Sequence, residues 1–185
     1  MSENTEFAKL LEENGVVFIG PGSHSIHAMG DKIESKKIAV NAGVNTIPGF
    51  VGEVHDDEEV LKISREIGYP VMIKAAAGGG GKGMRVAWND KQALDGFRLS
   101  KQEALSSFGD DRMLIEKFID KPRHIEIQVL SDGTNTIYLN ERECSIQRRN
   151  QKVIEEAPSS FLDPKTREAM GQQACALANA VGYKR

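Results

Sequence analysis

The 185-residue sequence has only two cysteines, Cys144 and Cys175, and no long apolar run. Neither cysteine stands in a Cys-x-x-Cys pair or at zinc-site spacing, so we expect two reduced thiols in a reducing compartment. No stretch of about 18 consecutive apolar residues occurs, which excludes a membrane-spanning helix. Residues 1–11 lack the apolar core of an export signal, so we expect any targeting peptide to lie outside this chain.

The sequence also lacks a basic excess. Its formal net charge is −3, which leaves no surplus of cations to hold nucleic acid. The apolar fraction of 39% is enough for a buried core and argues against disorder. His24 and His27 are closely spaced, but no carboxylate or cysteine stands at ligand spacing from them, so we expect surface side chains. The chain should fold without nucleic-acid or membrane partners and without metal ligands of its own.

Apolar periodicity and capping residues predict helices and strands along the first part of the chain. A helix is expected over residues 4–14, followed by a buried, parallel strand at Val16–Ile19. A second helix should run from about residue 23 or 26 to residue 42, with Gly43 as its stop. This order of helix, buried strand and helix is typical of α/β proteins.

From Thr46 the pattern changes to that of a compact α+β module. Asp56 and Glu59 form a capping-box pattern that opens a helix, and Gly68 closes it. The predicted order is helix, strand, strand, helix and strand, at residues 56–68, 70–75, 84–88, 89–107 and 113–118.

Strict alternation over residues 124–130 predicts a strand with His124, Glu126 and Gln128 on one face, which is either a solvated sheet face or part of a site. A turn and a return strand at 136–140 should follow. Residues 140–156 are dense in hydrogen-bonding groups and in charges of both signs. They are interpreted either as a salt-bridged surface loop or as a site for carboxylate, bicarbonate or phosphate oxygens. A last helix is expected from Asp163 to Gly182.

The run Gly78–Gly83 satisfies the pattern G-x-G-x-x-G, but two predicted strands flank it. A dinucleotide-binding turn leads into a helix instead. A P-loop would need glycine at Ala76 and serine or threonine after Lys82. A protein-kinase glycine loop would be followed by H-R-D and D-F-G motifs, which are absent.

The remaining interpretation is a glycine-rich hairpin whose backbone amides close over phosphates. Lys74, Lys82 and Arg85 flank the run and would supply cations. The alternative is a flexible hairpin tip. Because ordering several glycines costs considerable chain entropy, and a two-residue turn would serve a plain hairpin, the context favours phosphate binding.

Several motifs then occur in a specific order: Met29–Lys32, Gly68–Val71, Ile73–Ala75, Gly78–Met84, Glu116–Lys117, Pro122–Gln128, Glu141–Ser145, Gln147–Arg149 and Gln151–Lys152. Together they resemble the biotin carboxylase component of biotin-dependent carboxylases, and the resemblance covers the chain from Gly15 onward. Among the subfamilies, three segments look most like the propionyl-CoA carboxylases: Ile47–Phe50, Ser106–Asp111 and Gln147–Asn150.

The resemblance implies an α/β (α+β) fold of the ATP-grasp type, incomplete in this chain. Residues 1–45 would be the end of an N-terminal Rossmann-like subdomain with its connector, 46–118 a mobile lid, and 119–185 the beginning of the C-terminal subdomain. The family makes carboxyphosphate from ATP, Mg²⁺ (or Mn²⁺) and bicarbonate. It then carboxylates biotin on a biotin carboxyl carrier domain, and a carboxyltransferase β subunit completes the full enzyme. The compartment would be the mitochondrial matrix in a eukaryote and the cytoplasm in a bacterium.

The resemblance also implies roles for individual residues by matching position. Lys32 and Lys74 would bind ATP phosphates, Lys152 would hold bicarbonate, and Arg149 would act beside it in catalysis. Backbone amides of the glycine loop would close over the phosphates: Gly80, Gly81, Lys82, Gly83 and Met84. The adenine would be bordered, partly through backbone, by Glu116, Lys117, Phe118 and Ile119. The ribose and phosphates would lie near His124, Gln147 and Asn150, although most of the family has histidine in place of Asn150.

The family's metal-binding and catalytic residues lie in a Glu-Met-Asn-x-Arg stretch that does not occur here. Because the metal supplies the largest electrostatic contribution to phosphoryl transfer, we expect no ATP turnover from this chain alone. The alternatives are a non-catalytic nucleotide- or partner-binding module, or part of another acyl-CoA or pyruvate carboxylase.

Overall fold

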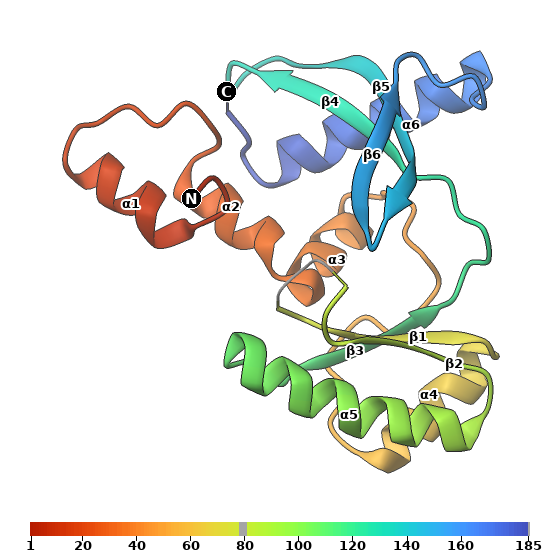
Figure 1. The fold of residues 1–185 in the computed structure, drawn as a ribbon. Helices are drawn as coiled ribbons and strands as arrows, with labels where there is room; N and C mark the ends of the chain where they lie inside the picture. The colour runs from red at the N-terminus through yellow and green to blue at the C-terminus, as the bar shows by residue number, and fades with distance from the viewer. Residues whose placement is uncertain (78–80, 185) are drawn as a thin grey trace. The chain divides into compact units, whose positions relative to one another are not determined.

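The computed structural model describes residues 1–77 and 81–184 and shows a mixed α/β chain with two three-stranded sheets (Figure 1). Contacts within the chain divide it into two compact units. The first unit comprises Met1–Asn45, Arg123–Arg148 and Lys152–Arg185, and the second comprises Thr46–Pro122 and Arg149–Gln151. Within the described ranges, no helix combines the length and the apolar character needed to cross a bilayer.

The second unit is a small antiparallel sheet covered by two helices. Its strands lie in the order β2–β1–β3, and both neighbours of β1 pair with it antiparallel. The elements are α4 (Asp57–Ile67), β1 (Val71–Ala75), β2 (Met84–Ala87), α5 (Asp90–Phe108) and β3 (Met113–Lys117). Each of the predicted helices and strands of this module is confirmed, with boundaries shifted by one or two residues.

Strand alternation explains where the core of the second unit lies. Val71, Ile73 and Ala75 on β1 are buried and pack in one cluster with side chains of α4, α5 and β3, including Phe97 and Ile115. The intervening residues of β1 lie on the opposite face and are only half-buried. This period of two leaves one sheet face for the helices and the other for polar side chains.

The helices of the second unit begin and end where the sequence predicts. The Asp56 carboxylate accepts a hydrogen bond from the backbone N–H of Glu59 at 2.9 Å, and the Asn89 side chain accepts one from Gln92 at 3.0 Å. Such N-caps satisfy amides that have no partner inside the helix. Gly109 ends α5 with a left-handed φ of 69°, which glycine adopts without strain.

The first unit combines helices from both ends of the chain with the second sheet, in which the strand order is β4–β5–β6. Helix α6 packs on β5 and β4. The elements are α1 (Thr5–Glu13), α2 (Ser23–Gly30), α3 (Lys32–Asn41), β4 (Ile125–Ser131), β5 (Thr136–Arg148), β6 (Gln151–Glu156) and α6 (Pro164–Ala180).

The prediction of one helix over residues 23–42 was wrong, because the segment forms two helices that meet at Asp31. The Asp31 backbone is extended, and its carboxylate accepts hydrogen bonds from the N–H groups of Ile33 at 2.8 Å and Glu34 at 3.0 Å. Aspartate in this position caps a new helix instead of continuing the old one.

The predicted buried strand Val16–Ile19 was also wrong. The segment is irregular, and its side chains are exposed, with 73% of Val17 and 94% of Ile19 accessible. None of the described strands pairs with it. An apolar run becomes a strand only when a neighbour supplies the other half of the hydrogen-bond ladder, which the run itself cannot specify.

Residues 140–156 form regular β-structure, so their interpretation as a loop was wrong. Strand β5 continues to Arg148, and β6 returns after a two-residue turn at Arg149 and Asn150. Both turn residues have left-handed backbones, with φ of 52° and 62°. Positive φ at both positions is the pattern of a type I′ hairpin turn. An Asn-Gly pair would have predicted this turn from the sequence, whereas the Arg-Asn pair does not.

The core of the second unit predicts a large effect for Ile73→Ala. Ile73 is fully buried, so truncation should lower the free energy of unfolding by about 2–5 kcal/mol. Trp88 is the only tryptophan and lies in this unit, so its fluorescence during urea unfolding reports on the core of the second unit. The matched control is Leu99→Ala on exposed α5 surface, with an expected change within about 0.5 kcal/mol. Equal losses from both variants would contradict the assignment of the core.

Candidate functional site

A lysine and a glutamate form an ion pair on the half-buried face of the β2–β1–β3 sheet. Lys74 Nζ lies 2.7 Å from Glu116 Oε2, and the two side chains are 23% and 12% exposed. Register places them on one face, because Met72 pairs with Glu116 and Lys74 follows Met72 by two residues. The structure therefore brings together two residues that the family resemblance assigned to different parts of one nucleotide, Lys74 to the phosphates and Glu116 to the border of the adenine.

Lys74 also lies beside the end of the glycine run. Its cross-strand partner on β2 is Met84, the first strand residue after the run. The N–H of Ala75 donates to the carbonyl of Gly83 at 2.8 Å, which extends the pairing by one residue toward the loop. The ammonium group is thus carried by the strand pair from which the loop emerges.

The described glycines of the run have the backbone that the phosphate-binding interpretation needs. Gly81 and Gly83 have positive φ angles of 82° and 64°. A Cβ at Gly83 would lie 2.9 Å from the Cβ of Ala75, and a Cβ at Gly81 would clash with the Asn150 side chain. A side chain would be strained at both positions because φ is positive, and at Gly83 the Ala75 methyl group also leaves no room for one. Gly80, also expected at the site, lies outside the described residues.

Arg85 was expected to supply a cation to the loop, and this was wrong. Its register partner is Ile73, so it lies on the sheet face that the helices cover. Its Nη1 donates to Ser100 Oγ at 3.0 Å and to Glu103 Oε2 at 2.9 Å, both on α5. Lys82, by contrast, has an exposed side chain.

The adenine-bordering residues at the end of β3 are held by the fold. Lys117 Nζ donates hydrogen bonds to the backbone carbonyls of Gly68 at 2.8 Å and Tyr69 at 2.9 Å. Its ammonium group therefore holds the end of β3 to the segment before β1. The Phe118 ring makes an edge contact with Trp88 at a centroid distance of 6.1 Å. Ile119 is 44% exposed. A contact of this segment with a base, partly through backbone, stays a prediction.

In the first unit, Glu126 is the centre of a cationic cluster on one face of the β4–β5–β6 sheet. Lys152 Nζ contacts its Oε1, His124 Nε2 lies 3.1 Å from the same oxygen, and Arg142 Nη2 lies 3.4 Å from Oε2. Hydrogen bonding from Lys152, followed by that from His124 and Arg142, lowers the pKa of Glu126 to about 2, although partial burial opposes the shift. The pKa of Lys152 is raised in turn by Glu126.

This cluster unites residues that the sequence placed in separate segments. Arg142 also donates to Gln128 Oε1 at 3.0 Å, so the predicted polar face of β4 joins the polar segment 140–156. Three further expected site residues lie outside the cluster. The Gln147 side-chain nitrogen donates a hydrogen bond to the backbone carbonyl of Cys144 at 2.9 Å. Lys32 is the first residue of α3, and Arg149 is exposed in the hairpin turn. The roles of Gln147, Lys32 and Arg149 toward ATP and bicarbonate stay predictions.

Both cysteines are free thiols. Cys144 is fully buried, and burial, together with the charges of Glu126 and Glu155, raises its pKa. Burial likewise raises the pKa of Cys175. Protonated thiols are poor nucleophiles, so neither cysteine has the environment of a catalytic thiolate.

Sequence reasoning missed a second network, buried on the opposite face of the same sheet. Glu141 is 3% exposed and receives a bidentate hydrogen bond from Arg167 of α6, with its shortest contact at 2.8 Å. Glu143 is 6% exposed. Its carboxylate accepts a hydrogen bond from Arg123 Nη1 at 2.7 Å and another from the hydroxyl of Ser159. The signal was available, because these two glutamates alternate with Arg142 and therefore lie on the other face.

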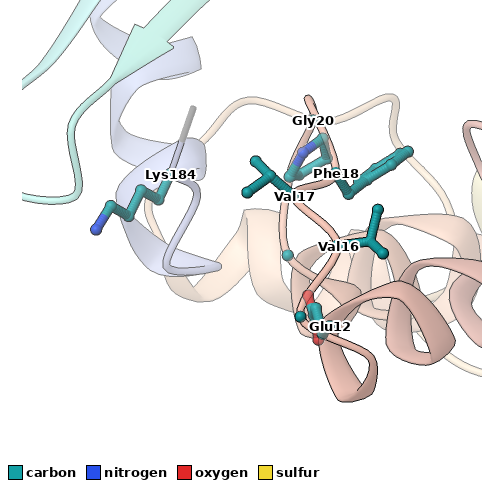
Figure 2. A pocket seen from close by; sticks show the side chains of 9 residues that line it. Glu12, Val16, Val17, Phe18, Gly20 and Lys184 are labelled. Atoms are coloured by element: carbon teal, nitrogen blue, oxygen red, sulfur yellow. The ribbon is translucent and has the colours of Figure 1, made fainter.

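A hollow in the first unit does not contain the predicted site residues. It has a volume of about 370 Å³ and lies beside the irregular segment after α1 (Figure 2). Its one carboxylate, Glu12, is used to bind the N–H and hydroxyl of Ser23 at 3.0 and 2.9 Å. The lining residues are Glu12, Gly15, Val16, Val17, Phe18, Gly20, Pro21, Gly22 and Lys184.

The family model for the ATP-binding domain of the carbamoyl-phosphate synthase L chain matches residues 31–185. The chain therefore belongs to this family of ATP-binding domains. Within the family it resembles propionyl-CoA carboxylase alpha chains. The human mitochondrial alpha chain is 72% identical over 99% of this chain, and that of the bacterium Ruegeria pomeroyi is 67% identical over the same share. The chain spans about a quarter of the length of these relatives, 25% and 27%.

Solved structures of biotin carboxylases have the same fold. A biotin carboxylase from Campylobacter jejuni, in a β-γ-ATP complex, is 45% identical with a TM-score of 0.94. The biotin carboxylase domain of Hydrogenobacter thermophilus 2-oxoglutarate carboxylase, in complex with MgADP, ADP and bicarbonate, is 48% identical with a TM-score of 0.93. Each match covers 99% of this chain and 41% of the other. The expected fold class and family are confirmed.

The Glu126 cluster predicts a specific acid sensitivity of the first unit. A pKa lowered from 4.5 to about 2 means that the ionised carboxylate stabilises the fold above pH 4.5, and that this contribution is lost as the pH falls toward 2. Glu126→Gln should therefore lose less unfolding free energy than the wild type between pH 6 and about pH 3. Urea unfolding, followed through reaction of buried Cys144 with a pyridyl disulfide in a Cys175→Ser background, measures this loss.

The control for this comparison is Glu34→Gln, which removes an exposed ion pair with Lys37 on α3 of the same unit. Between pH 6 and about pH 3, Glu34→Gln should lose as much unfolding free energy as the wild type does. If Glu126→Gln and the wild type lose the same free energy over this range, the cluster does not hold the charge as described.

Proposed function

We propose that this chain is the ATP-binding part of a biotin carboxylase, working within a propionyl-CoA carboxylase. The single observation that carries the proposal is the position of Lys74. Its ammonium group lies on the sheet face opposite the helices, beside the strand that receives the glycine loop, where a polyphosphate over the loop would meet a cation. The match to an ATP-binding family supports this use.

The second unit would act as the cover of the nucleotide. Loop amides from Gly81 to Met84 would bind phosphate oxygens as a nest, and Lys74 would neutralise part of their charge. The end of β3, from Glu116 to Ile119, would border the adenine. Closure over the nucleotide would exclude water, which otherwise hydrolyses a carboxyphosphate.

The remaining contacts would come from α3 and from the β4–β5–β6 sheet with its hairpin turn. We assign Lys152 to bicarbonate, with Arg149 acting near it, and Lys32 to the phosphates. His124, Gln147 and Asn150 are assigned to the ribose and phosphate side of the nucleotide. Because Glu126 already contacts Lys152 and His124, bicarbonate and nucleotide chemistry would be coupled through one carboxylate.

The subdomain assignment follows the same proposal: residues 1–45 as the end of a Rossmann-like subdomain, 46–118 as the lid, and 119–185 as the start of the C-terminal subdomain. Mg²⁺ would neutralise the β- and γ-phosphates, and we assign no residue of this chain to it. Biotin on its carrier domain would be the carboxyl acceptor, and a carboxyltransferase β subunit the partner. The compartment would be the mitochondrial matrix in a eukaryote and the cytoplasm in a bacterium.

A second candidate is a module that binds nucleotide without turning it over. Both candidates require ATP to bind at the same place, and ATP hydrolysis by the chain separates them.

ATP binding tests the proposal through Lys74→Met. Removing the ammonium group should weaken ATP binding at least about tenfold, since a charged contact to phosphate contributes more than about 1.4 kcal/mol. Isothermal titration calorimetry of the 185-residue chain measures the affinity. Lys62→Met on exposed α4 surface of the same unit is the matched control and should bind as the wild type does. Unchanged affinity in Lys74→Met would remove the proposed phosphate contact.

A further inference from the structure

The last residue of the glycine run rests directly on α5. Gly83 is buried, and a Cβ built on it would lie 3.7 Å from the Cβ of Ala104 and 3.8 Å from the carbonyl oxygen of Ser100. On its other side the Cβ would lie 2.9 Å from the Cβ of Ala75 on β1. The backbone at the base of the loop is thus wedged between a strand and a helix.

A single carboxylate on α5 fastens this backbone. The Glu103 Oε2 accepts a hydrogen bond from Arg85 Nη1 at 2.9 Å, and the N–H of Gly83 helps to lower the pKa of the same carboxyl. Arg85 also donates to Ser100 Oγ at 3.0 Å, so the guanidinium spans two successive turns of α5. These bonds hold the start of β2, two residues after Gly83, to the helix.

Backbone pairing holds the same place from the strand side. The N–H of Ala75 donates to the Gly83 carbonyl at 2.8 Å, and the N–H of Ala76 donates to the carbonyl of Arg112 at 2.8 Å. The two ends of the loop are therefore tied to the sheet. Through Arg85, Glu103 adds a tie to the helix, which restricts the direction in which the chain leaves Gly83.

Glu103 is poorly placed to bind a nucleotide itself. Arg85, its partner, lies on the helix-covered face of the sheet, whereas Lys74 lies on the opposite face. A carboxylate would also repel phosphates. Its contacts are instead those of a group that shapes the loop from behind.

We propose that Glu103 is a positioning residue for the ATP site, which holds the base of the glycine loop so that the loop amides are arranged before the phosphates arrive. This inference rests on the proposed nucleotide function. Pre-arrangement reduces the chain entropy that binding would otherwise have to remove. Loss of the Glu103 contacts should weaken ATP binding about fivefold to tenfold without removing any contact to ATP.

Glu103→Gln in the 185-residue chain tests the proposal, because it keeps the size of the side chain and removes its charge. ATP affinity is measured by calorimetry and stability by thermal unfolding. Arg98→Ala is the matched control: it removes an exposed ion pair of the same helix with Asp57, far from the loop residues in sequence. A merely structural role would make both variants lose similar stability and keep wild-type ATP affinity.

The amide resonance of Gly83 gives a readout that does not depend on ATP. In the wild type it should titrate in acid with the Glu103 carboxyl, whose pKa is lowered by the hydrogen bonds from Arg85 and Gly83. In Glu103→Gln it should move upfield, because the acceptor is no longer charged. The wild-type titration decides the point even if the variant folds poorly.

Weaker ATP binding in Glu103→Gln but not in Arg98→Ala, with the Gly83 resonance behaving as described, is the expected result. Wild-type affinity in Glu103→Gln, or a Gly83 resonance that ignores the acid titration, would overturn the positioning role and leave the nucleotide site standing. No ATP binding by the wild type would instead overturn the proposed function, and the inference with it.

Discussion

The ion pair between Lys74 and Glu116 is the interaction on which the rest of the proposed site depends. Neither side chain is more than a quarter exposed, so each would be destabilising without the other. The pair allows a small sheet to keep an ammonium group on the face that its helices leave open. At this degree of burial the charges of the pair are less screened than on a free surface.

The same alternation of strand residues separates function from support in both units. In the second unit, Lys74 lies on one face while Arg85 is bound to α5 on the other. In the first unit, the accessible cluster around Glu126 lies on the face opposite the buried glutamates Glu141 and Glu143. One side of each sheet therefore presents charge, and the other uses charge or apolar packing to hold the fold together.

Local features were predictable, and features that depend on distant partners were not. The helix caps at Asp56 and Asn89 predicted where the helices of the second unit begin, because helix capping and apolar periodicity depend on a few neighbouring residues. The run Val16–Ile19 has the composition of a buried strand, yet strand formation requires a partner that the run does not name. The turn at Arg149 and Asn150 needs positive φ from residues that seldom adopt it. The contacts of the site followed from strand register, whereas the chemical roles of its residues came from family resemblance.

Labelling by an acyl phosphate of ATP tests the central claim most directly. Such a reagent transfers its acyl group to lysines next to the bound phosphates, and peptide mass spectrometry locates the label. The account predicts rapid acylation of Lys74, suppressed by excess ATP, while Lys62 on the exposed surface of α4 reacts slowly and without protection. Equal, unprotected labelling of these two lysines would show that no triphosphate rests on this sheet.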